Sequence, residues 1–152
     1  MAIIIPKNEL EIIKKHAAEI FPYEACGGLL GKIEGENKII VKAYPAENRY
    51  GKIAWDSFEI EPKDMLEMDK ISRKENLDIL GFYHTHPNHP AIPSNFDINA
   101  SWPYYSYVIL SIKGGDPENI VDIKSYLMPD KTSAPIAEDI IMSPSSILEK
   151  IV

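Results

Sequence analysis

The sequence has almost no cysteine, since Cys26 is the only one in 152 residues. A single cysteine excludes an intramolecular disulfide and any zinc site built from four cysteines. A chain without disulfides suits a reducing compartment, and we expect a cytoplasmic protein. Because no separate histidine is assigned to activate its thiol, we expect Cys26 to be a small buried residue and not a nucleophile.

Positive charge is scarce as well. The chain has 16 lysines and arginines against 23 acidic residues, which gives a formal net charge of −7. This balance leaves no basic surface for a phosphate backbone, so we expect no nucleic-acid partner. No apolar run approaches the roughly 18 residues of a membrane span. The first residues also lack the basic stretch and long apolar region of a secretory signal, and we expect no membrane partner.

The length and the 45% hydrophobic content fit one globular domain. Hydrophobic periodicity and turn residues predict helices over 7–20, 62–74 and 94–101, and strands over 27–33, 38–44, 77–84, 104–112 and 120–127. Helices placed between hairpins indicate a single α/β domain with a mixed sheet over residues 1–128, whose strand order the pattern leaves open. Residues 129–152, rich in proline and serine, are expected to be a C-terminal extension that packs on the domain or on a partner.

Two histidines and one aspartate have the spacing of a metal site. His84 and His86 are two residues apart, so on a strand their imidazoles would share one face. Ser94 and Asp97 form the pattern Ser-x-x-Asp at a helix start, which places the serine at the cap and the carboxylate in the first turn. Two imidazoles and one carboxylate would leave the fourth position of a tetrahedral Zn²⁺ open for water, as in catalytic zinc sites. The serine and aspartate also make sense as a helix cap alone.

Glu24 lies between the first predicted helix and the first predicted strand. From there its side chain could lean over a site built from later elements and accept a proton. A solvated acid at a helix end is the alternative. Spacing alone does not decide between the two.

These residues resemble the JAMM motif of the MPN+ metallopeptidases, also called the JAB domain. That motif is a distant glutamate followed by His-x-His, seven residues, a serine, two residues and an aspartate. Here His84 and His86 are followed by residues 87–93, then Ser94, two residues and Asp97, with Glu24 upstream. The resemblance covers about residues 23–127. It implies the JAB/MPN fold, a mixed and curved sheet flanked by helices with an architecture similar to cytidine deaminase.

The resemblance also implies a role for each motif residue. His84, His86 and Asp97 would bind one Zn²⁺ ion, which carries the catalytic water in its open position. Glu24 would act as general base and then as general acid, and Ser94 would hydrogen-bond the developing oxyanion.

The implied activity is a zinc metalloprotease that cleaves the bond after the C-terminal Gly-Gly of a ubiquitin-like protein, as an isopeptide or as a linear extension. Only residues 98–103 separate Asp97 from the next predicted strand, which leaves little room for the long insertion of eukaryotic members. A stand-alone prokaryotic enzyme acting on a sulfur-carrier protein is therefore favoured, and a homodimer stays open.

The main alternative is a non-catalytic MPN scaffold that only binds a ubiquitin-like partner, although such proteins usually lack the metal ligands. The metallo-β-lactamase pattern is excluded because it needs further histidines, and none follows His89. The zinc deaminases are excluded because they need a Pro-Cys-x-x-Cys pair. For His89 itself, an ordinary loop residue and a substrate contact both remain open.

Overall fold

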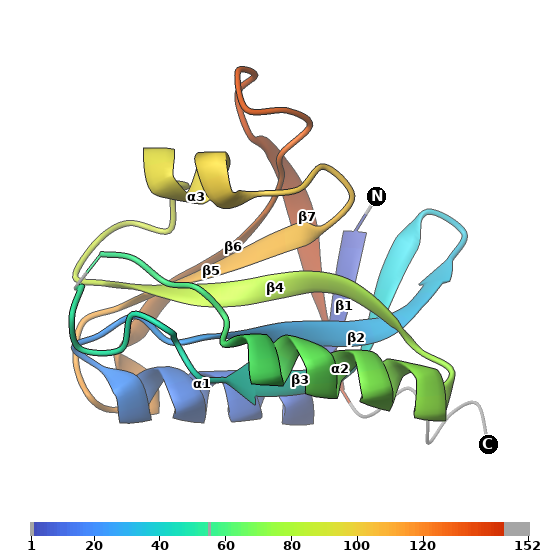
Figure 1. The fold of residues 1–152 in the computed structure, drawn as a ribbon, viewed down its shortest axis with the longest axis horizontal. Coiled ribbons are helices and arrows are strands. Elements are labelled where there is room, and N and C mark those ends of the chain that lie inside the picture. The colour runs from blue at the N-terminus through green and yellow to red at the C-terminus, as the bar shows by residue number, and fades with distance from the viewer. Residues whose placement is uncertain (1, 55, 145–152) are drawn as a thin grey trace.

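A single mixed sheet wraps around on itself to form the body of the molecule (Figure 1). The computed structural model describes residues 2–54 and 56–144. In this part of the chain, the strands are β1 (Ala2–Pro6), β2 (Cys26–Glu34), β3 (Asn37–Ala46), β4 (Asp78–Pro87), β5 (Ser106–Ile112), β6 (Ile120–Leu127) and β7 (Ile136–Ser143). The helices are α1 (Lys7–Ile20), α2 (Pro62–Glu75) and α3 (Asn95–Ala100), with a short 3₁₀ turn at Pro117–Asn119.

The predicted helices and inner strands are present, but two strands escaped the sequence patterns. These are β1, at the start of the chain, and β7, in the segment expected to be an extension. The two pair in parallel from Ala2 opposite Asp139 to Pro6 opposite Ser143. Residues 145–152 of the expected extension lie outside the described residues.

The pairing of β1 with β7 corrects the expected shape of the sheet. The sequence predicts a curved sheet, whereas the structure closes it as a barrel in the order β1-β3-β2-β4-β5-β6-β7. Parallel neighbours need a long connection, and here nearly the whole chain separates the two strands. A pairing of that range leaves no local pattern in the sequence.

Apolar clusters hold the helices against the sheet, and two of them include several large buried side chains. The first joins α1 to the sheet through fully buried side chains that include Leu10, Ile13 and Tyr83. The second joins α2 to β2 and β4 through Met68, Leu30 and Phe82. None of the helices in the described residues has the length and apolar composition that a membrane crossing requires.

The strand that carries the histidines is central and longer than predicted. It runs to Pro87, whereas the sequence pattern ends it at His84, and its residues from Leu80 onward are buried. It pairs with β2 on one side and in parallel with β5 on the other. A side chain at Gly81 would meet the backbone oxygen of Ser106 at 2.3 Å, so only glycine permits this approach of β4 to β5. The end of β4 is thereby held rigidly from both sides.

Candidate active site

The two histidines share one buried face at the end of β4. His84 is completely buried and His86 is 8% exposed. Their Nε2 atoms lie 3.1 Å apart. The ring of Phe58 stacks on His84 with centroids 4.4 Å apart and an angle of 20°, which fixes the orientation of that imidazole. Phe58 was not singled out from the sequence, because no local pattern connects it to β4.

Asp97 reaches the same place from α3. The hydroxyl oxygen of Ser94 accepts a hydrogen bond from the Asp97 backbone N–H at 3.1 Å, and Asp97 Oδ2 accepts one from the Ser94 N–H at 2.9 Å. This capping box fixes both the helix start and the carboxylate. Asp97 Oδ1 lies 3.2 Å from His84 Nε2, and Oδ2 lies 3.0 Å from His86 Nε2. The cap and the contact with both imidazoles therefore coexist in one side chain.

Glu24 is brought to the histidines by strand pairing. The Ala25 N–H donates to the Thr85 hydroxyl at 2.8 Å, and the Thr85 N–H donates to the Ala25 carbonyl at 3.0 Å. This places the preceding residue, Glu24, beside the end of β4, where one ligand atom of Glu24 and one of each histidine lie within 4.8 Å of one another. The site thus contains all five residues that the sequence pattern singled out.

The carboxylate of Glu24 is buried and accepts no hydrogen bond from the described residues. The residue is 3% exposed. Burial raises its pKa to about 8, the His86 ring opposes this, and the negative charges of Asp97 and Asp56 add to the rise. A carboxyl group of this kind can both accept and release a proton near neutral pH.

The three close donor atoms form a set that could hold a cation. His86 Nδ1 lies 2.8 Å from the carbonyl oxygen of Pro90, which can only accept, so Nδ1 donates this hydrogen bond. Its Nε2 lies 3.0 Å from Asp97 Oδ2 and 3.1 Å from His84 Nε2. Burial opposes the charged form of the ring, but the hydrogen bonds to Asp97 and Pro90 outweigh it and raise the pKa of His86. A metal ion bound here would take the place of the proton between Nε2 and the carboxylate. A tetrahedral ion with bonds of about 2.0–2.1 Å holds its ligand atoms about 3.3–3.4 Å apart, close to the separations found here.

The charges of the three groups agree with this interpretation. Burial lowers the pKa of His84, which keeps its ring neutral. Burial opposes the ionised form of Asp97, but the hydrogen bonds with the two imidazoles outweigh it and hold the carboxyl pKa below its usual value. Asp97 is therefore a carboxylate between two nitrogen donors. An alternative set of three ligands would be Glu24 with the same two histidines. Its ligand atoms lie within 4.8 Å of one another, which is a looser arrangement than the one with Asp97.

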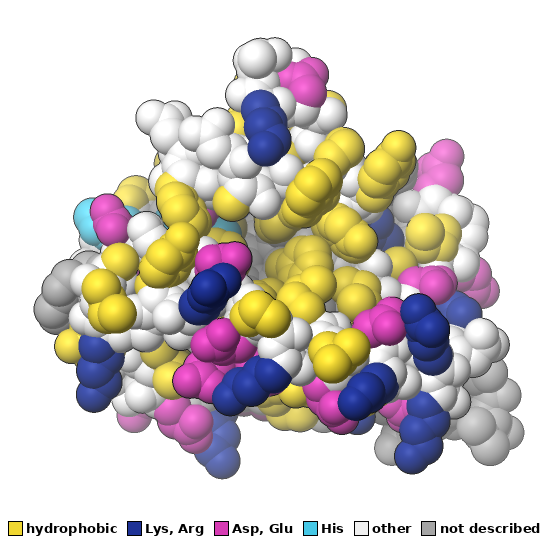
Figure 2. Space-filling model, in the orientation of Figure 1, with side chains coloured by type: hydrophobic (Ala, Val, Ile, Leu, Met, Phe, Trp, Pro, Cys, Tyr) yellow, Lys and Arg dark blue, Asp and Glu magenta, His cyan; other side chains and the backbone are white. Residues whose placement is uncertain are grey.

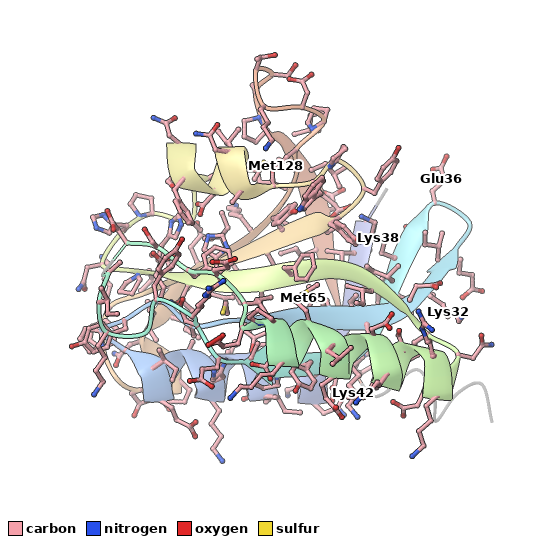
Figure 3. The ribbon with its side chains drawn as sticks, viewed as in Figure 1. Lys32, Glu36, Lys38, Lys42, Met65 and Met128 are labelled. Carbon is pink, nitrogen blue, oxygen red and sulfur yellow. The ribbon has the colours of Figure 1, made fainter. Side chains whose placement is uncertain are left out.

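A cavity of about 410 Å³ is lined by Glu24 but not by His84, His86 or Asp97. Two further cavities are lined by those three residues between them. The larger, of about 430 Å³, is lined by His84 and Asp97 and by apolar side chains that include Phe96, Trp102 and Tyr107. We call it the apolar groove. Figure 2 shows hydrophobic side chains around the hollow between α2 and the segment from α3 to β5, and Met65 lines the groove from α2 (Figure 3).

The second cavity, of about 310 Å³, lies on the side of Glu24 and His86. We call it the acidic pocket, and its lining consists of Glu24, Asp56, His86, Pro87, His89, Pro90, Ile92 and Ser94. His89 thus lies beside the site, whereas the sequence left its place open. Cys26 is fully buried and its thiol pKa is raised to about 12 by burial, as expected for a small interior residue.

Comparison with known proteins places the chain in a family. The sequence profile of the prokaryotic homologs of the JAB domain matches residues 6–126. A desampylase from Pyrococcus furiosus is 30% identical over 131 residues, which cover 85% of this chain and 83% of that protein. A probable TtuB-protein conjugate cleaving protease from Thermus thermophilus is 26% identical, with coverage of 86% and 78%. A solution structure of a protein from Desulfitobacterium hafniense superposes with a TM-score of 0.81 at 33% identity, over 94% of both chains.

Proposed function

This chain belongs to the family of prokaryotic homologues of the JAB domain, and from that membership we propose that it is a zinc-dependent protease of the JAMM type. It hydrolyses the bond after the C-terminal Gly-Gly of a ubiquitin-like or sulfur-carrier protein. The observation that carries the proposal is the convergence of two imidazoles and one carboxylate, with separations of 3.0–3.2 Å, beside an unpartnered buried glutamate. The names of the two relatives support cleavage of protein conjugates as the reaction.

The residues assigned to the zinc ion are His84, His86 and Asp97. They are chosen over the triad with Glu24 because Asp97 is in contact with both rings and is held by its capping box. Zinc bound there would lower the pKa of its water toward about 7 and polarise the scissile carbonyl. His86 would be held in the correct tautomer by its hydrogen bond to the Pro90 carbonyl.

Glu24 moves the proton. It takes one from the attacking water as the new carbon–oxygen bond forms, and it gives that proton to the leaving nitrogen as the carbon–nitrogen bond breaks. The products are a free carboxylate on the Gly-Gly tail and a free amine. Without an ion, burial raises the pKa of Glu24 to about 8. The charge of a zinc ion nearby would lower this pKa, toward a value at which the group takes and returns a proton near neutral pH.

Ser94 has a hydroxyl that is still free to act. In the capping box its oxygen accepts from Asp97, so its own O–H remains available to donate to an oxyanion. The residue is exposed and lines the acidic pocket. Loss of one such donor costs about 10²–10³ in rate in other hydrolases.

The apolar groove supports a narrow tail as the acyl part of the substrate. Near His84 its wall is built from Phe58, Phe96 and Tyr50, whose ring centroids lie 6.3 Å apart in two consecutive edge contacts. Bulky aromatic walls beside the reacting position favour residues without side chains. A Gly-Gly terminus meets that requirement.

The test is a cleavage assay with a defined metal state. Purified protein is stripped with a chelator, reloaded with Zn²⁺, and mixed with a fusion in which a carrier protein ending in Gly-Gly is followed by a reporter. We expect cleavage after the second glycine only in the zinc-loaded sample. Tight zinc binding without cleavage of any such fusion or isopeptide would support the non-catalytic scaffold instead.

A further inference from the structure

We propose that Asp56, in the acidic pocket, favours an alkylamine over an aromatic amine as the leaving group, so that this pocket holds the amine side of the scissile bond. This inference rests on the proposed function, in which a lysine isopeptide is one of the two bond types, and deepens it by naming a residue that determines specificity. The juxtaposition that carries it is a second cavity of about 310 Å³ that opens on Glu24 and His86, next to the apolar groove that opens on His84 and Asp97.

The metal donor set separates the two cavities. The groove is lined by His84 and Asp97, whereas the pocket is lined by His86, Glu24 and Ser94. The two lists of lining residues have no member in common. A substrate whose carbonyl lies at the donor set therefore extends into one cavity on its acyl side and into the other on its amine side.

The side of Glu24 is the amine side. Glu24 lines the pocket but not the groove, and it has to deliver a proton to the leaving nitrogen. It also lines a third cavity of about 410 Å³, but His84, His86 and Asp97 do not, so that cavity does not adjoin the donor set. The carboxylate of Glu24 is buried, accepts no hydrogen bond within the described residues, and lines the pocket. An unpartnered carboxylate in that position lacks a cationic or hydrogen-bonding partner, which an incoming amine would supply.

The lining of the pocket suits a lysine side chain. Pro87, Pro90 and Ile92 provide apolar surface for the methylene groups, and Asp56 and Glu24 provide negative charge near the nitrogen. Asp56 is exposed and lines the same pocket as Glu24 and His86. It belongs to the connection between β3 and α2, which passes beside the end of β4 (Figure 1).

Positive charge develops on an alkylamine as it leaves. The nitrogen takes up the proton held by Glu24 while the carbon–nitrogen bond breaks, and the free ε-amine, with a usual pKa of about 10.4, takes a further proton from solvent at neutral pH. Asp56 would stabilise this charge. An aromatic amine stays neutral after release, so the same carboxylate would do little for it.

The experiment compares two substrates that share one acyl part. A carrier protein ending in Gly-Gly is joined either to the ε-amine of lysine in a fluorescent peptide or to 7-amino-4-methylcoumarin. For Asp56→Asn in the zinc-loaded protein, we expect kcat/KM to fall about twofold to fivefold on the lysine conjugate and to stay unchanged on the coumarin conjugate, since an exposed charge is partly screened. Asp56→Lys should enlarge the loss on lysine to about tenfold or more, and 1 M salt should shrink both losses.

Glu11→Gln is the matched control, because it removes one exposed carboxylate of α1 that does not line either cavity or the third cavity beside Glu24. It should leave both substrates unaffected, and zinc content should be equal in all proteins. Equal loss on both substrates, or no loss on the lysine conjugate, overturns the assignment of Asp56. Cleavage of the coumarin conjugate alone by the unmodified protein overturns the lysine pocket but leaves the proposed function intact. Failure to cleave either conjugate overturns both.

Discussion

Replacing Glu24 by glutamine exchanges one carboxylate oxygen for an amide nitrogen at nearly constant volume. The side chain is 3% exposed and accepts no hydrogen bond within the described ranges, so the exchange breaks no contact that supports the fold. The backbone carbonyl of Glu24, which accepts from the Asn48 side chain at 3.1 Å, is retained. The variant therefore tests proton transfer with little structural disturbance.

The expected loss follows from the role of the carboxylate. General acid–base catalysis contributes about 10²–10⁴ in rate, which corresponds to about 2.7–5.4 kcal/mol of the activation barrier. We expect the single-turnover rate constant for cleavage of a Gly-Gly carrier fusion to fall by at least about 10² in Glu24→Gln. Because Asp97 and the two histidines are assigned as ligands, the zinc content should remain that of the unmodified protein. Single-turnover conditions remove product release from the comparison.

Two results would refute this reasoning. Cleavage by Glu24→Gln at the native rate would mean that another group shuttles the proton. Loss of zinc from Glu24→Gln, measured by plasma mass spectrometry, would mean that Glu24 and not Asp97 is the third ligand. The zinc ion would then be bound by Glu24, His84 and His86, whose ligand atoms lie within 4.8 Å of one another. Glu11→Gln, the same chemical change on the exposed surface of α1 and away from the cavities that Glu24 lines, provides the control for both measurements.

Three further predictions concern the ligand set and the frame around it. Asp97→Asn should weaken zinc affinity by more than about 100-fold in competition with a chelator, and unchanged affinity would remove Asp97 from the ligand set. Burial lowers the pKa of His16, and its Nδ1 lies 2.7 Å from the Tyr83 hydroxyl. As pH falls below about 6.5, the unfolded chain binds a proton at His16 more readily than the folded chain does, so the stabilising contribution of this residue should be lost. Urea titrations at pH 7.5 and 5.5 should show a smaller loss for His16→Gln than for the unmodified protein, and equal losses would contradict the assignment. The Ser106 hydroxyl donates to the buried Glu138 at 2.7 Å and accepts from Lys38 at the same distance. Ser106→Ala should therefore lower the free energy of unfolding by about 1–3 kcal/mol. A change below about 0.5 kcal/mol would argue against this network.

The sequence alone was enough for features whose cause is local. The two-residue spacing of His84 and His86 puts their rings on one face of any strand, and the Ser-x-x-Asp pattern sets a capping box wherever a helix begins there. The amphipathic pattern of α1 and the proline at the start of α2 likewise mark their helices within a few residues. Each of these features depends on residues within one or two turns of one another.

Only the tertiary structure decided the features that depend on distant pairing. Glu24 stands beside His86 because the start of β2 pairs with β4 sixty residues later in the chain, through Ala25 and Thr85. The barrel closes because β7 finds β1 across almost the whole sequence, and no local pattern encodes that meeting. The cavities on the two sides of the donor set arise in the same way, from the loop after β3, from α2 and from α3. Local spacing can specify which groups are able to act together, but long-range backbone pairing decides whether they meet.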